Sequence, residues 1–170
     1  LGLFVQSFGT ELPNTGGELK LVDRSGRLVA ETQFGTISIP ANADNLRISE
    51  INFNPLSGLT QFGESQAGGS NFEFVEFTNI GQQPIELAGV QLISITKDDD
   101  QEGIEFSFDS QTLEPGQYLV VVKNREAFVS RFGDTARIAN GSNGQQGLAG
   151  EFANRLGNGG ETITVTNASN

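Results

Sequence analysis

The sequence lacks four residue types, and each absence narrows what the protein can do. Its 170 residues include no Cys, which excludes disulfides, thiolate zinc sites and a cysteine nucleophile in this sequence. The absence of His removes the commonest general base and every catalytic triad built on it. Trp and Met are missing too. A chain without Met cannot contain its own start, so we expect a mature product or an excised fragment.

Basic residues are scarce as well. Ten Lys and Arg stand against 21 Asp and Glu, which gives this acidic chain a formal net charge of −11. Such a surface repels a polyanion on average, because nucleic-acid binding rests on neutralising phosphates. No run of about 18 apolar residues is present. We therefore expect neither a nucleic-acid partner nor membrane insertion.

Glycine, phenylalanine and short alternating segments dominate what remains. The chain has 22 Gly and 13 Phe, and its apolar segments are short and separated by turn signals. In "IEFSFDS" (Ile104–Ser110), for example, Ile104, Phe106 and Phe108 share one face. This pattern predicts an all-β, immunoglobulin-like β-sandwich. Residues 125–132, "REAFVSRF", form the one predicted helix, a short one.

The two ends of the chain resemble each other. Residues 1–26 align without a gap with residues 145–170, and each copy has a Gly-rich turn followed by an alternating strand. Identical or similar residues recur at Phe8/Phe152, Asn14/Asn158, Gly16/Gly160, Leu19/Ile163 and Leu21/Val165. We interpret the chain as slightly more than one period of a tandem repeat, cut inside two neighbouring copies.

This interpretation divides the chain into three parts. Residues 1–34 are the closing strands of a preceding or partial repeat, residues 35–45 are a linker, and residues 46–170 are the sandwich. Pro40 argues against a central strand in the linker. At the start of the sandwich, Leu46 and Ile48 share one phase and Ile51 the other, which predicts a β-bulge near Glu50.

Four segments of residues 46–170 resemble the bacterial members of the lamin-tail domain family. They are "ISEINFNP" (48–55), "FEFVEFTNIGQQPIELAGVQL" (72–92), "FSFDSQTLEPGQYLVVV" (106–122) and "LGNGGETITVTNAS" (156–169). The resemblance implies an immunoglobulin-like β-sandwich of a secreted or cell-surface protein with several domains. It also implies framework rather than catalytic roles for the motif residues Glu50, Asn52, Glu76, Asn79, Gly89, Pro115, Gly116, Asn158 and Gly160.

The family usually has one more strand after "TNAS", where this sequence stops. In the first copy that position is occupied by "RLVAETQF" (Arg27–Phe34). We predict that Arg27–Phe34 completes the sandwich, by folding back within the chain or by strand exchange with a neighbour. Unpaired sheet edges are an aggregation liability, and identical elements exchange at low cost.

Two groups of carboxylates are candidates for chemistry. Glu50 and Glu76 could act as a general acid–base pair. The alternative is that each accepts backbone N–H bonds at a bulge or turn, and we favour this structural role. The acidic turn with Asp98, Asp99, Asp100 and Glu102 resembles a loose Ca²⁺ site, although it lacks the EF-hand spacing. A solvated hairpin tip explains the same residues.

The sequence therefore favours a non-enzymatic interaction or spacer module, extracellular or on a bacterial cell surface. Its expected partner is another protein or a neighbouring repeat, and no cofactor is expected apart from the possible Ca²⁺. One alternative is a Ca²⁺-assisted adhesion or carbohydrate-binding module, although a chain without Trp and with one Tyr is poorly supplied for sugar stacking. The other is an accessory domain of a secreted hydrolase.

Overall fold

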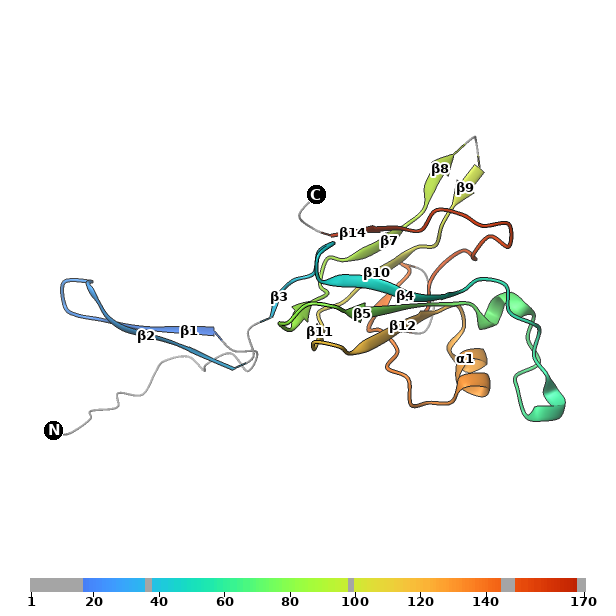
Figure 1. Cartoon of the computed structure of the whole chain (residues 1–170), viewed down its shortest axis with the longest axis horizontal. Helices are drawn as coiled ribbons and strands as arrows, with labels where there is room; N and C mark the ends of the chain where they lie inside the picture. Colours follow the sequence, from blue (N-terminus) through green and yellow to red (C-terminus); the bar gives the residue numbers. More distant parts are fainter. Residues whose placement is uncertain (1–16, 36–37, 98–99, 145–148, 168–170) are drawn as a thin grey trace. The chain divides into compact units, whose positions relative to one another are not determined.

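A computed structural model describes residues 17–35, 38–97, 100–144 and 149–167 of the chain. The chain forms two compact units, residues 1–38 and residues 39–170 (Figure 1).

The first unit contains a β-hairpin. Strand β1 (Gly17–Val22) pairs antiparallel with β2 (Leu28–Phe34) in a two-stranded sheet. Asp23 closes the turn, since its Oδ1 accepts from the backbone N–H groups of Ser25 at 2.9 Å and Arg27 at 3.0 Å. Apolar side chains on both strands are left exposed: Leu19, Leu21, Val22, Leu28 and Val29. A two-stranded hairpin of this kind has no core of its own.

The second unit is a β-sandwich, which confirms the predicted fold class. One sheet has the order β12 (Tyr118–Val122), β5 (Phe74–Asn79), β4 (Leu46–Asn52). The facing sheet has the order β13 (Gly141–Ser142), β10 (Phe106–Phe108), β7 (Gln91–Ile93), β14 (Thr164–Thr166). Three short strands, β11 (Thr112–Leu113), β6 (Ile85–Glu86) and β3 (Ile39–Pro40), form a third sheet.

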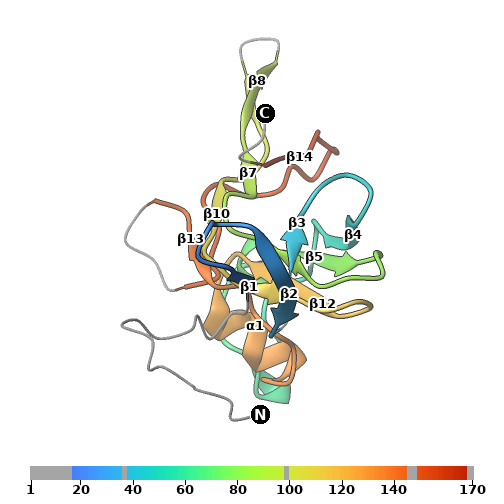
Figure 2. The same cartoon turned by 90° about the vertical axis from the view of Figure 1, so that its left-hand side faces the viewer.

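Three further elements extend the sandwich. Hairpin β8 (Ile95–Lys97) and β9 (Asp100–Glu102) projects beyond β7 in both views (Figures 1 and 2). Two 3₁₀ turns, η1 (Thr60–Phe62) and η2 (Gly69–Phe72), lie in the long connection between β4 and β5. Helix α1 (Arg125–Phe132) follows β12 and has the predicted bounds.

Strand β5 is buried on both faces, which explains its apolar residues at both odd and even positions. Val75 and Phe77 face the core between the two sheets, where Phe77 contacts Phe108 edge-on at 5.5 Å. Phe74 faces outward and is covered by Phe128 of α1, also edge-on at 5.5 Å. The helix is therefore held by a second apolar cluster on the outer face of the sheet.

The bulge near Glu50 is confirmed. The β4–β5 register shifts between Ile48, which pairs with Phe77, and Glu50, which pairs with Glu76. Ser49 is the extra residue, and the shift is what the change of apolar phase in the sequence requires.

The predicted linker differs from the structure in its second half. The compact unit begins at Ile39, and Ile39–Pro40 form β3, parallel to β6 at the edge of the third sheet. The buried Asn45 fixes the turn that follows, because its amide donates to the Pro40 carbonyl and its Oδ1 accepts from the Asn42 N–H. Proline is tolerated in an edge strand, so Pro40 excludes only a central strand, as predicted. The sandwich unit begins at Ile39 rather than at Leu46.

Within the described part of the chain, β2 has β1 as its only strand partner. The completion of a sandwich by Arg27–Phe34, within its own chain or in a neighbouring copy, stays a prediction.

Candidate functional site

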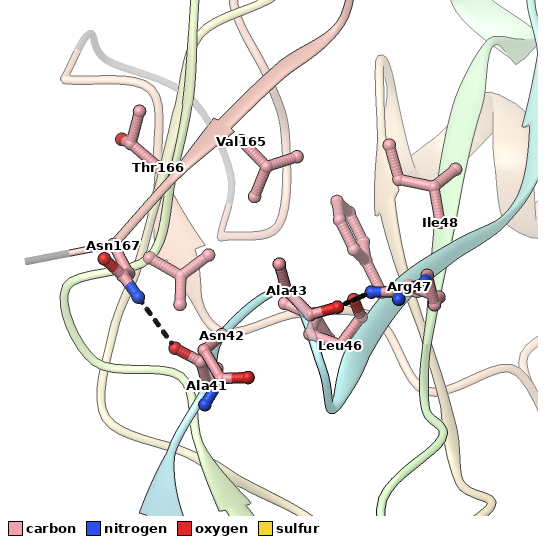
Figure 3. Close-up of a pocket in the computed structure, with 11 residues that line it drawn as sticks. Ala41, Asn42, Ala43, Leu46, Arg47, Ile48, Val165, Thr166 and Asn167 are labelled. Carbon is pink, nitrogen blue, oxygen red and sulfur yellow. Dashed lines mark hydrogen bonds between the residues drawn. The ribbon is translucent and has the colours of Figure 1, made fainter. Parts of the chain in front are cut away.

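A groove opens between the edge strands of the two facing sheets. Strand β4 ends one sheet and β14 ends the other, and a cavity of about 400 Å³ lies between them. Figure 3 shows its residues from β4 on one side and from β14 on the other. Among the described residues, no strand pairs with the outer edge of β14.

The groove has an apolar floor and a polar rim. Its floor is formed by core residues, and its walls carry the half-buried Ile48 and the exposed Val165, which is 38% exposed. The buried residues that reach the floor are Ala41, Leu46, Phe77 and Val90. At the rim, the Asn167 amide donates to the Ala41 carbonyl at 3.0 Å, and the Arg47 guanidinium donates to the Ala43 carbonyl (Figure 3).

An unpaired strand edge beside an apolar slot suits an extended peptide. Backbone groups at the edge of β14 can hydrogen-bond to an added strand, and alternate side chains of that strand can enter the slot. None of the predicted framework or metal residues lines this groove. Sequence reasoning missed it because the groove joins strands more than 110 residues apart.

Glu50 and Glu76 lie opposite each other on β4 and β5, but they do not share a cleft. Glu50 is exposed and Glu76 is half-buried, and the two line different cavities. Glu76 Oε1 accepts from the Ser49 hydroxyl at 2.7 Å. Ser49, the extra residue of the bulge, therefore contacts Glu76 through its hydroxyl group. The expected contact was a backbone N–H group.

The carboxylate that is buried is Glu73, which the sequence reasoning passed over. It is 1% exposed, and its Oε2 accepts from the Leu156 N–H at 2.8 Å. Burial raises the pKa of Glu73, and the Leu156 hydrogen bond and the charges of Lys123 and Arg155 act in the opposite direction. The sequence does contain a signal for this burial. Glu73 stands at an odd position, as do Val75 and Phe77, which face the core.

Asn79 is the most fully bonded of the predicted framework residues. It is 1% exposed, and its amide donates to the carbonyls of Gln83 and Leu113, each at 2.8 Å. Its Oδ1 accepts from the Gly81 N–H at 2.8 Å. Asn79 therefore ties the β5–β6 turn to β11. Asn52 makes one comparable contact, donating to the Phe72 carbonyl at 3.0 Å.

The other predicted framework residues lie in turns. Gly89, Gly116 and Gly160 have φ values of +83°, +74° and +89°, a region that favours glycine. Pro115 precedes Gly116 in the turn before β12, where the Gly116 N–H donates to the Asn79 carbonyl. Asn158 is exposed and lines a small polar cavity beside Glu73.

The acidic turn is only partly described. Asp98 and Asp99 lie outside the described residues, and Asp100 pairs with Lys97 at the end of the β8–β9 hairpin. The Glu102 carboxylate accepts from the Thr162 N–H at 3.4 Å. The described part of the chain contains no cluster of three or more potential metal ligands of the Asp, Glu, His or Cys type.

A comparison with protein-family models identifies a family for most of the chain. The model described as Lamin Tail Domain matches residues 39–170, which is most of the chain. The chain belongs to the lamin-tail domain family. The matched region begins at the same residue as the second compact unit, so the β1–β2 hairpin lies outside it. No match was found among curated proteins, and none among solved structures.

Lamin-tail domains are non-catalytic, immunoglobulin-like domains of the protein-interaction type. In this lamin-tail domain, the groove between β4 and β14 is the feature best suited to such an interaction. None of the helices in the described ranges is long and apolar enough to span a membrane.

Proposed function

We propose that this lamin-tail domain is a non-enzymatic interaction and spacer module that binds an extended protein segment along β14. The observation that carries the proposal is the groove between β4 and β14. It combines an apolar floor with a strand edge that has no partner among the described residues.

The carboxylates support this proposal against an enzyme. Acid–base work on a glycoside needs two carboxyl groups facing one cleft. Glu50 and Glu76 line separate cavities, and the buried Glu73 bonds to the backbone of Leu156. Their contacts are those of framework residues.

The parent protein, in this proposal, is a secreted or surface-exposed bacterial chain with several domains. The internal repeat and the division into two units suit a tandem array in which copies space other domains. Neighbouring repeats are then one class of partner, and strand exchange through Arg27–Phe34 is the finer form of that contact.

Peptide selection against the full chain tests the binding site. A display library of random extended peptides is selected on the wild-type chain and then measured on Val165→Lys and Tyr118→Lys. Both variants place a lysine at an exposed strand position, but Tyr118 lies on β12 at the opposite edge of its sheet.

We expect enriched peptides with alternating apolar residues, which bind Tyr118→Lys like wild type and Val165→Lys about tenfold more weakly. Failure to enrich any peptide would overturn the proposed function. Equal binding to both variants would overturn the assignment of the site.

A further inference from the structure

A small polar cavity lies beside the buried carboxylate of Glu73. Its volume is about 280 Å³, and it shares no lining residue with the groove between β4 and β14. We propose that this cavity binds a small zwitterion of the amino-acid type, with the ammonium group at Glu73 and the carboxylate at Arg155. This site is separate from the peptide groove and adds a second binding function to the domain.

Glu73 presents an oxygen that has no partner. Its side chain is 1% exposed and lines the cavity. Oε2 accepts from the Leu156 N–H, whereas Oε1 forms no hydrogen bond with any described residue. No described lysine or arginine lies within ion-pair distance of this carboxylate. A buried carboxylate that lacks such partners is costly, so the unbonded oxygen favours a positively charged donor.

The charges near Glu73 do not take the place of that donor. Burial raises the pKa of Glu73, and the charges of Lys123 and Arg155 oppose this shift only in part. Lys123 does not line the cavity, and its Nζ lies 5.8 Å from the centre of the Phe152 ring. An ammonium group bonded to Oε1 would stabilise the ionised form of Glu73 directly.

Arg155 supplies the opposite charge at the same cavity. It is exposed, and its guanidinium forms no hydrogen bond or ion pair with a described residue. A guanidinium in this state can bind a carboxylate through two parallel hydrogen bonds. The cavity therefore combines one acidic and one basic side chain. A divalent cation would require several carboxylate oxygens, and the guanidinium would repel it.

Uncharged polar groups form most of the remaining lining. They belong to Asn54, Ser57, Ser70 and Asn158, with Pro55 as the apolar contribution. Oxygens of these side chains can accept the ammonium protons that Glu73 leaves unbonded. The volume lies below the roughly 300–1,000 Å³ of drug-sized ligand sites. The ligand is therefore small and polar.

Contacts within the loop before β5 hold the cavity open in one shape. The Arg131 guanidinium donates to the Ser57 carbonyl at 3.2 Å. Gly69 packs so closely against the chain that a Cβ at this position would overlap the Pro55 carbonyl oxygen. The cavity is therefore preformed, which lowers the entropic cost of binding.

Amide NMR spectra of the full chain, recorded during titration with each of the common L-amino acids, test the site. We expect at least one amino acid to shift the amide signals of Ser70, Glu73 and Leu156. Two derivatives of that amino acid are the diagnostic probes, since its decarboxylated amine lacks the carboxylate and its N-acetyl form lacks the ammonium group. Each derivative should bind at least about tenfold more weakly.

Variants then test the two charged residues. Glu73→Gln and Arg155→Ala should each weaken binding of the amino acid about tenfold. Glu114→Gln and Arg125→Ala are the matched controls, because they make the same changes outside the cavity, and both should bind like wild type. If Glu73→Gln does not fold, Arg155→Ala and the two derivatives decide.

Three results would overturn the proposal. The first is that no amino acid shifts the amides around the cavity. The second is equal binding of either derivative or of Arg155→Ala. The third is that Ca²⁺ alone produces the same shifts and competes with the amino acid, which would make the cavity a cation site. Val165→Lys alters only the groove and should bind the amino acid like wild type, so each of the two sites can fail without the other.

Discussion

At the scale of single residues, the polar side chains buried inside this lamin-tail domain act on its backbone. Glu73 accepts from the Leu156 N–H, and Asn79 bonds three backbone groups. The Leu156 N–H and the Leu113 carbonyl belong to buried residues and would otherwise lack these partners. Their replacement is expected to change stability rather than a catalytic activity.

Glu73 makes the stability of the domain depend on pH. Because burial raises its pKa, the folded chain holds this proton to a higher pH than the unfolded chain does. Between an unfolded pKa of about 4.3 and the higher folded pKa, the folded state binds more protons, so the free energy of unfolding falls as pH rises.

Glu73→Gln should remove this fall in the free energy of unfolding, because glutamine does not titrate. Its side-chain oxygen can still accept from the Leu156 N–H. Urea unfolding across this pH range, on wild type and Glu73→Gln, measures the difference. Glu114→Gln is the control, since Glu114 is only partly buried, and should follow wild type. Parallel curves for wild type and Glu73→Gln would contradict the account.

Asn79 should be the most sensitive framework residue. Asn79→Ala leaves the buried carbonyl of Leu113 without its donor, and we expect a loss of about 1–3 kcal/mol in the free energy of unfolding. Asn158→Ala removes an exposed amide and should change it by less than about 0.5 kcal/mol. Denaturant unfolding of the two variants measures both values, and similar losses would argue against a special role for Asn79.

At the scale of elements, helix α1 anchors the long loop between β4 and β5. The Arg131 guanidinium donates to both carboxylate oxygens of Glu64, at 3.1 and 2.7 Å, and lies 3.6 Å from the centre of the Phe72 ring. The Ser65 N–H donates to the Ser130 hydroxyl at 2.9 Å. The Arg131 side chain is only 14% exposed.

Removing this anchor should loosen the loop without unfolding the sandwich. Arg131→Ala is expected to speed amide hydrogen exchange at Leu59 and Ser65, whose N–H groups bond to Glu64 and Ser130. Arg125→Ala, an exposed change on the same helix, is the control. The Arg131 hydrogen bond lowers the pKa of Glu64, so acid should have the same effect as Arg131→Ala once the pH falls below that pKa. Unchanged loop exchange in Arg131→Ala would show that the ion pair does not anchor it.

Local pattern was enough to predict some elements and not others. The helix at residues 125–132 and the bulge at β4 follow from phase within a few residues, and both are confirmed. Strand β3 is two residues long and exists because β6, 45 residues later, offers a parallel partner. Arg131 likewise meets Glu64 across 67 residues. Contacts of this range leave little trace in a local pattern.

At the scale of the whole molecule, the same sequence pattern forms a strand in each unit, β1 in the first and β14 in the second. The alignment of β1 with β14 came from the sequence, whereas the groove beside β14 and the β1–β2 register came from the structure. In the described part of the chain, β14 is the edge strand along which we propose that an extended protein segment binds. In a tandem array, a neighbouring repeat would be one class of partner for that strand.

Residue-resolved amide hydrogen exchange of β14, with and without one of the selected peptides, tests this claim most directly. If an extended segment pairs with β14, the β14 amides that face away from β7 should exchange more slowly when the peptide is bound. Core amides of β5, such as those of Val75 and Phe77, serve as the internal reference and should not change. Exchange of β14 amides that the bound peptide leaves unchanged would contradict the account.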